Sequence, residues 1–477
     1  MTHANYIGGA WQPITAAARN VNPSDTTDLI GEYALAGAGE VALAAEAAQA
    51  AFPAWSRTTP LERAEILERI AQEILARRAE LADLLAREEG KTLAEALGEA
   101  TRAGQLFRYF AQEALHPAGE YQPSIRAGVE VEVTREPVGV VGLVTPWNFP
   151  LVIPAWKIAP ALAYGNCVLF KPAELVPGCA WALADIIVRA GVPPGVFNLL
   201  MGEGATAGAA LVADERVRAL SFTGSVKVGR GILATAAARG AKVQLEMGGK
   251  NALVVLADAD LDLAVRVALE GAFFSTGQRC TASSRLIVEE AVHERFVTGL
   301  TGAMRAQVID DARRPGTTIG PVVDARQLEQ DLRYLEIGVR EGARLVCGGE
   351  AVERARPGFY LTPALFTDST PGQRINQEEI FGPIASVQQV RGYEEALAAV
   401  NGTAFGLCAG ICTRSLKHAR AFQRDADVGM VMVNLPTAGI DYNVPFGGRR
   451  ASGYGGKELA SGAREFYTQG KTAYFRG

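Results

Sequence analysis

Residues 138–172 read VGVVGLVTPWNFPLVIPAWKIAPALAYGNCVLFKP and are the most informative stretch about the architecture. The two ends of the stretch, VGVVGLV (138–144) and CVLFKP (167–172), are apolar almost throughout, which is typical of strands buried on both faces. A helix-forming segment separates them. Because parallel strands need a crossover connection, usually a helix, this order predicts two neighbouring parallel strands. The stretch therefore predicts an α/β fold.

The alternation of strand-like and helix-like segments continues along the chain. Three more strand candidates precede Cys280, at VFNLLMG (196–202), ALSFTG (219–224) and NALVVLA (251–257). A second alternating region follows Cys280, with strand candidates at 285–290, 342–349, 359–366, 384–390, 408–413 and 429–434. Short Gly/Pro turns separate these segments. We therefore expect two α/β parts, each with a mostly parallel sheet covered by helices.

Two segments depart from this alternation. Residues 61–92, LERAEILERIAQEILARRAELADLLAREEGKT, have apolar residues at helical spacing and predict one or two long amphipathic helices that end at Gly90. In VEVEVTR (129–135), apolar and polar residues alternate instead. This pattern predicts an exposed strand or hairpin with two different faces.

The bulk composition limits the classes of function. A chain of 477 residues is too long for one core and should form two or three domains. Its 48% hydrophobic and 21% charged residues are typical of a soluble globular protein, and a net charge of −5 gives no basic field to attract nucleic acid. The apolar runs are far too short to cross a membrane, and the start, MTHANYIGGAWQPI, carries no secretory signal.

The cysteines and histidines indicate a cytoplasmic protein without a metal site. Six cysteines are scattered along the chain without the density of a disulfide scaffold, so we expect free thiols in a reducing compartment. There is no paired CxxC set and there are only four histidines, which argues against zinc. Most of the cysteines should be small buried hydrophobic residues, so the chemical question is which one is reactive.

A candidate phosphate-binding turn lies in the first half of the chain. There is no GxGxxG after the first strand, but ALSFTG leads into GSVKVG (224–229) and a helix-forming stretch. Gly224 and Gly229 would let the backbone approach a pyrophosphate at a helix N-terminus, although a purely structural turn is the commoner role of such glycines. Lys171 and Glu174 follow another strand, where they could bind ribose hydroxyls or form a solvated ion pair.

Cys280 stands in FFSTGQRCTASSR (273–285), a poor environment for a core cysteine. Gly277 permits a tight turn before it, and small polar residues follow it, as expected around an exposed reactive thiol. Since a free thiol has a pKa of roughly 8.5, a nearby cation or helix terminus must favour the thiolate. Arg279 could contribute that charge, or it could bind a carboxylate of the substrate.

Two further residues suit chemistry at such a thiol. Glu246 precedes two glycines in EMGGK (246–250), where its carboxylate could activate water, although a lone Glu is more often a surface residue. Asn148 lies between two prolines in VTPWNFP (144–150). The prolines would hold its amide as an oxyanion donor requires. The commoner role of such an Asn is to bond the backbone of a rigid turn.

Seven motifs together resemble the aldehyde dehydrogenase superfamily, in its order and from about residue 5 to the end. They are VTPWNFP, FKPAE (170–174), FTGSVKVG (222–229), EMGGK, FFSTGQRCTASSR, EEIFGP (378–383) and PFGGRRASGYGGKE (445–458). The resemblance implies a Rossmann-type cofactor domain (1–118 and 138–248) and an α/β catalytic domain (249–467). It also implies a small β oligomerisation arm (119–137 and 468–477) that pairs subunits into a homodimer or homotetramer, a role that the VEVEVTR pattern fits.

The resemblance also implies residue roles. Cys280 is the nucleophile, Asn148 and the Cys280 amide form the oxyanion hole, Glu246 is the general base, and Lys157 supports the site. The residues implied to bind NAD or NADP are Lys171 and Glu174 at the adenosine ribose, Gly224, Ser225 and Gly229 at the pyrophosphate, Glu379 and Phe381 at the nicotinamide riboside, and Thr145 and Trp147. Glu458 matches a glutamate often linked to proton relay, but the GYGGKE spacing is one residue longer than in common relatives.

The implied reaction is oxidation of an aldehyde to a free acid through a Cys280 thioester. Relatives that pass the acyl group to coenzyme A generally lack the glutamate that is Glu246 here. Glu174 would repel a 2′-phosphate and favours NAD, but both cofactors stay open.

The implied substrate is narrower. STGQRCTASSR and MVMVNLPTAGIDYNVPFGGR (430–449) resemble α-ketoglutaric semialdehyde (2,5-dioxovalerate) dehydrogenases. Arg279 suits an aldehyde whose far end is a carboxylate. The residues expected to shape an apolar tunnel, unless they are plain core packing, are Phe149, Ile153, Trp156, Ile440 and Pro445. The alternatives are succinic or glutaric semialdehyde, or simple aliphatic and aromatic aldehydes.

Two other classes of function stay open. A non-catalytic dinucleotide-binding protein would be expected to lack the nucleophile or the base, and this chain has both. A thiol hydrolase would need a histidine base, and none of the four histidines (His3, His116, His293 and His418) lies in a motif.

Overall fold

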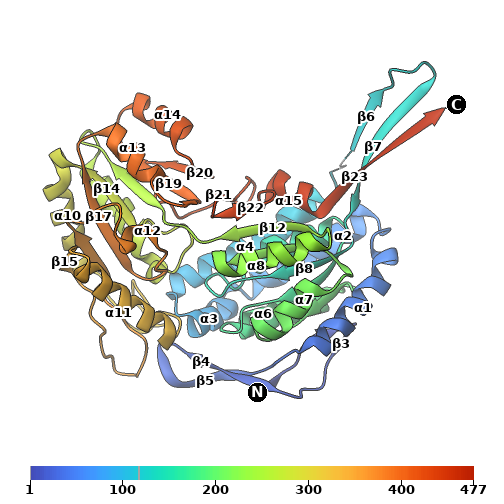
Figure 1. Cartoon of the computed structure of the whole chain (residues 1–477). Coiled ribbons are helices and arrows are strands. Elements are labelled where there is room, and N and C mark those ends of the chain that lie inside the picture. The colour runs from blue at the N-terminus through green and yellow to red at the C-terminus, as the bar shows by residue number, and fades with distance from the viewer. Residues whose placement is uncertain (1, 117–118, 477) are drawn as a thin grey trace.

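The computed structural model describes residues 2–116 and 119–476 (Figure 1). Residues 1, 117, 118 and 477, at the ends of the predicted segments 1–118 and 468–477, lie outside the described residues. Two α/β bodies lie side by side, each built on one large sheet, and a narrow arm projects from one of them. The predicted α/β class is confirmed. No helix within the described residues is long and apolar enough to cross a bilayer.

The first sheet has eight strands in the order β22-β12-β11-β8-β9-β10-β2-β3. Its parallel centre consists of β8 (Val140–Val144), β9 (Cys167–Lys171), β10 (Phe197–Leu199), β11 (Val217–Gly224) and β12 (Lys242–Met247), and β2 (Tyr6–Ile7) and β3 (Ala10–Trp11) extend one edge. The two strands predicted from residues 138–172 pair in parallel, with Val140 opposite Cys167. The helix between them is α5 (Val152–Ala163). The other helices of this body are α1 (Ala38–Trp55), α6 (Pro177–Arg189), α7 (Ala209–Ala213) and α8 (Val226–Ala238).

The second sheet has seven strands in the order β15-β16-β17-β14-β13-β19-β20. These are β13 (Ala252–Val255), β14 (Arg285–Glu289), β15 (Arg344–Cys347), β16 (Ala364–Thr367), β17 (Ile384–Val390), β19 (Cys408–Cys412) and β20 (Met430–Val433). All neighbours are parallel except β15 and β16, as the second alternating region predicts. Its helices are α9 (Leu261–Phe273), α10 (His293–Arg305), α11 (Ala325–Arg340), α12 (Arg374–Gln377), α13 (Tyr393–Asn401) and α14 (Leu416–Asp425).

The predicted amphipathic helices form a helical layer of α2 (Pro60–Ala76), α3 (Arg78–Glu89) and α4 (Leu93–Glu113). Gly90 ends α3 with a left-handed φ of +92°, and a Cβ there would lie 2.9 Å from Pro321, so glycine is required. Helix α4 starts at Leu93, directly after Thr92, because the Thr92 side chain accepts a hydrogen bond from the Glu95 amide while the Glu95 carboxylate accepts one from the Thr92 amide. This restart fixes the first turn of α4 close to the reaction centre described below.

The arm is a three-stranded antiparallel sheet of β6 (Gly119–Pro123), β7 (Val129–Pro137) and β23 (Thr468–Arg476). The strand predicted from VEVEVTR is therefore present as β7, and the C-terminal strand pairs with it from Thr468 opposite Pro137 onward. Large apolar side chains are exposed on the arm, namely Tyr121, Ile125, Tyr474 and Phe475. The remaining strands are β1 (Thr2–His3), β4 (Ala17–Asn22), β5 (Asp25–Ala34), β18 (Phe405–Gly406) and β21 (Arg449–Arg450).

The chain returns from the second sheet to the first near its end. Strand β22 (Gly453–Tyr454) pairs antiparallel with β12, and α15 (Ala460–Tyr467) follows it. Side chains of this segment, including Phe446, Leu459 and Phe466, belong to the core of the first body. The last part of the predicted 249–467 segment thus packs on the cofactor-side sheet, a long-range pairing that a two-residue strand does not reveal in the sequence.

Candidate active site

Cys280 lies where two cavities meet. One, of about 330 Å³, also touches Asn148, Glu246 and Glu379, and the other, of about 450 Å³, extends between helix α4 and the 438–442 loop. A third cavity, of about 320 Å³, shares Trp147 with the first and reaches Glu174. Cys280, Asn148, Glu246 and several of the predicted cofactor residues are thus gathered along one connected path. No three His, Cys, Asp or Glu side chains are grouped as metal ligands in residues 2–116 and 119–476.

The turn before Cys280 is held in an unusual backbone conformation. Ser275 and Thr276 both have left-handed φ values, 51° and 55°, which non-glycine residues rarely adopt. The Ser275 amide and hydroxyl donate to one oxygen of Glu95, at 2.6 and 3.0 Å. Gly277 has a φ of +66°, and a Cβ there would lie 2.3 Å from the Gly382 carbonyl oxygen. The tight turn expected at Gly277 is present, and helix α4 braces it.

The charged groups around the Cys280 thiol are acids. Burial, together with the negative charges of Glu379 and Glu246, raises the pKa of this thiol to about 12. Arg279, the cation expected from the sequence, directs Nε and Nη2 to the main-chain carbonyls of Phe274 and Glu270, each at 2.9 Å. The protein alone therefore keeps Cys280 as a thiol.

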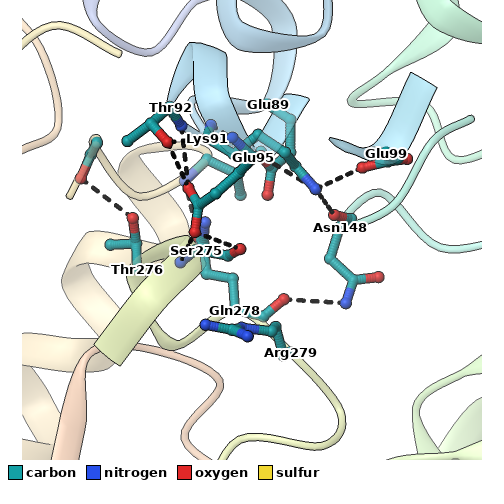
Figure 2. A network of polar contacts seen from close by, with 12 residues as sticks. Glu89, Lys91, Thr92, Glu95, Glu99, Asn148, Ser275, Thr276, Gln278 and Arg279 are labelled. Carbon is teal, nitrogen blue, oxygen red and sulfur yellow. Dashed lines mark hydrogen bonds and ion pairs between the residues drawn. The ribbon is translucent and has the colours of Figure 1, made fainter. Parts of the chain in front are cut away.

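Two hydrogen bonds hold Asn148 in place, in addition to the prolines on either side of it in the VTPWNFP motif. Figure 2 shows its Nδ2 donating to the Gln278 carbonyl, at 2.9 Å, and Lys91 Nζ donating to the Asn148 main-chain carbonyl, at 2.7 Å. Asn148 and the loop of Cys280 are thus tied together directly. The second Nδ2 hydrogen is left for another acceptor, and Asn148 lines the same cavity as Cys280.

Lys91 was not singled out from the sequence, since its type and spacing do not distinguish it from an exposed lysine. It is buried and binds Glu99 at 2.6 Å, and Glu89 lies 3.9 Å away (Figure 2). The other oxygen of Glu99 accepts the amides of Leu151 and Val152 at 2.9 and 3.1 Å, at the start of α5. One turn of α4 therefore holds the Asn148 loop through Lys91 and Glu99, and the Cys280 loop through Glu95.

Glu246 lies on β12 and is buried against a stretch of main chain that has no room for a side chain. Its Oε2 accepts the Gly448 amide at 3.1 Å, and a Cβ on Gly447 would come within 2.4 Å of Oε1. Burial raises the pKa of Glu246 well above its usual value, and the negative charge of Glu458 adds to this effect. Such a carboxyl group takes up and releases a proton closer to neutral pH than an exposed glutamate does.

Lys157 and Glu458 form a buried ion pair next to Glu246. Lys157 Nζ also donates to Ser221 Oγ at 2.8 Å. Phe446 and Glu458 exchange two main-chain hydrogen bonds, of 2.8 and 2.7 Å, which hold the GYGGKE segment despite its unusual spacing. Within the part of the chain that the structure describes, Glu458 Oε2 has no hydrogen-bond partner.

Six of the predicted cofactor residues line the first or third cavity, namely Trp147, Glu174, Gly224, Ser225, Glu379 and Phe381. Lys171 is buried and pairs with the half-exposed Glu174 at 3.2 Å, and burial lowers the pKa of Lys171. Gly224 and Ser225 line the first cavity, and Ser225 caps α8. Gly229 does not line it. A Cβ at Gly229 would lie 2.6 Å from Met247 Sδ, so this glycine allows the helix to pack on the sheet.

Several features of these cavities suit a bound dinucleotide. Glu379 accepts the Gly249 amide at 2.9 Å, and a Cβ on Gly248 would collide with its carboxylate at 1.9 Å. Burial raises the pKa of Glu379 to about 7. Phe381, with a left-handed φ of 65°, meets Trp147 edge-on at 5.2 Å. Thr145 precedes Pro146, which lines the first cavity, and its buried hydroxyl has no hydrogen-bond partner in residues 2–116 and 119–476.

The larger cavity has the apolar wall expected of a substrate tunnel. Four of the five predicted residues line it, namely Phe149, Ile153, Trp156 and Ile440. Pro445 is exposed and does not line it, whereas the next residue, Phe446, does. Successive side chains of an extended segment point in opposite directions, which explains the exchange. Arg279 lines the cavity as predicted, and so does Arg102 of α4, which sequence reasoning missed.

Comparison with known proteins gives this site its context. A sequence profile of the aldehyde dehydrogenase family matches residues 11–473. The chain belongs to the aldehyde dehydrogenase family. Betaine aldehyde dehydrogenase from Staphylococcus aureus, solved in complex with NAD+, superposes on this aldehyde dehydrogenase with a TM-score of 0.97 at 31% identity, covering 99% of this chain and 95% of that one. The fold predicted from the resemblance is confirmed, as are the activity, NAD(P)-dependent aldehyde oxidation, and the dinucleotide cofactor.

Two curated relatives are similar to this aldehyde dehydrogenase over nearly their whole length. One is "Alpha-ketoglutaric semialdehyde dehydrogenase" of Bacillus subtilis, 41% identical over 480 residues, which span 100% of this chain and 98% of the relative. The other is "2,5-dioxopentanoate dehydrogenase" of Saccharolobus solfataricus, 39% identical over 461 residues and 95% of each chain. The resemblance stated from the sequence is therefore confirmed at full length.

Proposed function

We propose that this aldehyde dehydrogenase oxidises α-ketoglutaric semialdehyde to 2-oxoglutarate. The observation that carries the proposal is the cavity at Cys280, whose wall combines apolar side chains with the guanidinium groups of Arg279 and Arg102. An aldehyde with a carboxylate at its far end matches both features, because guanidinium groups pair with carboxylates. The names of the relatives from Bacillus and Saccharolobus support the same substrate.

In the proposed mechanism, Cys280 first loses its thiol proton to water, and the resulting thiolate adds to the aldehyde carbon and forms a tetrahedral oxyanion. The Asn148 Nδ2 hydrogen that the protein leaves free donates to this oxygen, together with the Cys280 amide. Each such donor contributes roughly 3 kcal/mol to lowering the barrier. The Gln278 and Lys91 contacts hold Asn148 in place before the substrate arrives, so no reorganisation is needed when the charge develops.

The residues proposed to hold the dinucleotide are Lys171, Glu174, Gly224, Ser225, Glu379, Phe381, Thr145 and Trp147, with Gly229 keeping α8 against the sheet. The buried free hydroxyl of Thr145 and the cradle around Glu379 support this assignment. When bound, NAD or NADP would supply the hydride acceptor, and loss of hydride from the substrate carbon would leave Cys280 carrying a thioester. Glu174 favours NAD, since it would repel a 2′-phosphate.

Glu246 is the proposed general base for hydrolysis of the thioester. It takes a proton from water, the hydroxide attacks the acyl carbon, and the acid leaves as Cys280 regains its electron pair. Glu246 borders the cavity of Cys280, and its raised pKa keeps it basic enough for this step. We propose that the charges of the buried Lys157–Glu458 pair next to Glu246 adjust its pKa.

Replacing Glu458 with glutamine should shift the pH dependence of the deacylation step. The variant removes a negative charge that raises the pKa of Glu246 and leaves the Lys157 cation, which lowers it. Because Glu246 acts as a base only when ionised, the acid limb of the kcat profile should move to lower pH. The measurement is kcat against pH for the wild type, Glu458→Gln and the exposed control Glu465→Gln. A shift to higher pH, or none, would contradict the role of Glu458.

We propose that the chain is organised into two domains and an oligomerisation arm. Residues 1–118 and 138–248 form the cofactor domain, and 249–467 form the catalytic domain. The oligomerisation arm comprises 119–137 and 468–477, and its exposed apolar side chains support pairing into a homodimer or homotetramer. All six cysteines are free, and a reactive thiol at Cys280 needs a reducing compartment, which supports a cytoplasmic location.

The test of the substrate is kcat/KM for a panel of aldehydes with NAD and with NADP. The panel contains α-ketoglutaric, succinic and glutaric semialdehydes, with hexanal and benzaldehyde as uncharged members. We expect α-ketoglutaric semialdehyde to exceed the uncharged aldehydes by about a hundredfold, which is about 2.7 kcal/mol of discrimination. Equal values for hexanal would refute the substrate proposal and leave a broad aldehyde oxidiser.

A further inference from the structure

Arg102 lines the Cys280 cavity, and no acidic group of the described residues forms an ion pair with it. Residues Glu95, Gly98, Glu99 and Arg102 line this cavity from one face of α4, as the spacing i, i+3, i+4 and i+7 requires. In residues 2–116 and 119–476, the guanidinium of Arg102 makes no hydrogen bond or ion pair. It lies over the ring of Tyr442, with Cζ 5.2 Å from the ring centroid. A half-buried guanidinium with free N–H groups thus faces the tunnel.

The acidic neighbours of Arg102 on α4 are committed elsewhere. Both oxygens of Glu99 are used, one by Lys91 and the other by the amides of Leu151 and Val152. Both oxygens of Glu95 are used as well, by Thr92 and Ser275 (Figure 2). These carboxylates are therefore satisfied by their own partners and do not need Arg102.

Arg279, the other arginine of the cavity, is in a different state. Two of its nitrogens already donate to main-chain carbonyls. Burial lowers its pKa, and the charges of Glu95 and Glu270 act against that shift, so acids close to it balance its charge. A substrate carboxylate at Arg279 would meet this negative surrounding. At Arg102 it would meet a cation whose donors are free.

The Tyr442 ring suits Arg102 to binding a carboxylate end-on. A guanidinium stacked over a ring face keeps its N–H groups in its own plane, where they point away from the ring. Tyr442 is itself packed edge-on against Tyr109, at 5.6 Å, and so is a firm support. This cation–π contact lowers the number of conformations that Arg102 loses when it pairs with a ligand.

We propose that Arg102 is the specificity-determining residue that binds the distal carboxylate of the substrate, with Arg279 bracing the Cys280 loop. This inference rests on the proposed function, because it assumes a carboxylated aldehyde. It deepens that function by naming which of two arginines selects the substrate. The guanidinium forms two parallel hydrogen bonds with the carboxylate, while apolar side chains such as Phe149 and Trp156 cover the carbon chain.

The test compares kcat/KM for α-ketoglutaric semialdehyde and for hexanal in the wild type, Arg102→Gln, Arg102→Lys and Arg279→Gln. In Arg102→Gln we expect a loss of about thirtyfold to a hundredfold for the semialdehyde, carried by KM, and a change under about twofold for hexanal. Arg102→Lys should recover part of the loss, since it keeps the charge without the bidentate geometry. The matched control is Arg108→Gln, on the same helix but exposed and near Glu68, which should behave as the wild type.

The outcomes separate this inference from the proposed function. A wild type that prefers the semialdehyde, with Arg102→Gln keeping that preference, would overturn the role of Arg102 and leave the substrate proposal standing. Loss of the preference in Arg279→Gln alone would move the anchor to Arg279. An equal fall for both aldehydes in Arg102→Gln would show a structural effect and also overturn the inference. A wild type without the preference would refute the proposed substrate itself.

Discussion

Cys280→Ala is expected to abolish NAD(P)H formation from every aldehyde, by a factor on the order of 10⁴ or more, because no covalent adduct can form. The residue lies where the two cavities meet, and the other side chains there, such as Asn148 and Glu246, supply donors and acids but no nucleophile. Cofactor binding should be unchanged, since the proposed dinucleotide residues, such as Glu174 and Ser225, keep their side chains in this variant. Initial rates and titration of protein fluorescence with NAD measure the two properties separately.

The control for this variant is Cys347→Ala, the same substitution on β15 in the second sheet. It should retain wild-type rates. The pKa of about 12 for the Cys280 thiol adds a second readout, since alkylation by iodoacetamide should be slow at neutral pH and accelerate as the pH rises. Dehydrogenase turnover that persists in Cys280→Ala would refute the covalent mechanism.

Glu246→Gln should separate the two halves of the reaction. Glutamine has nearly the same shape and can still accept the Gly448 amide, but it cannot take a proton from water. We expect kcat to fall by about 10² to 10³-fold, the usual contribution of a general base. The first turnover should survive, so a burst of about one NADH per site should precede the slow steady rate.

The measurement for Glu246→Gln is stopped-flow NADH absorbance, with mass spectrometry of the quenched protein to detect the acyl adduct on Cys280. The exposed control Glu80→Gln, in a surface ion pair with Arg77, should turn over at the wild-type rate without accumulating adduct. Wild-type turnover in Glu246→Gln would exclude Glu246 as the base. A lost burst would instead place its role before the thioester.

Much of the fold could be predicted because its signals are local. Buried parallel strands are short apolar runs, and the helices ending at Gly90 have an apolar face with a repeat of 3.6 residues. The boundaries of β22 could not be predicted. Two residues, Gly453 and Tyr454, carry no strand pattern, and their pairing with β12 depends on a partner about two hundred positions earlier in the sequence.

The candidate site shows the same division. Cys280, Glu246 and Asn148 could be selected because chemistry demands their residue types and each stands in a distinctive motif. Lys91 and Arg102 could not, because a lysine after a helix end and an arginine within a helix are ordinary in sequence. Their importance comes from which partners the fold brings to them, such as the Asn148 carbonyl for Lys91.

The prediction that Pro445, and not Phe446, lines the tunnel failed for a different reason. The motif located the tunnel wall correctly to within one residue, but which of two neighbours faces inward depends on how the segment is turned about its axis. That rotation is set by the main-chain bonds between Phe446 and Glu458. A residue pattern of one proline and one phenylalanine does not contain this information.

The return of the chain end to β12 has a consequence for how the enzyme is made. Glu246 accepts a hydrogen bond from the Gly448 amide and is affected by the charge of Glu458. Gly448 and Glu458 are synthesised about two hundred residues after the strand that holds Glu246. Synthesis proceeds from the amino end, and domains fold as they emerge. A nascent chain can therefore form the parallel centre of the first sheet and already contain Cys280 while still lacking the groups around its base. Chemistry begins only once translation is almost finished.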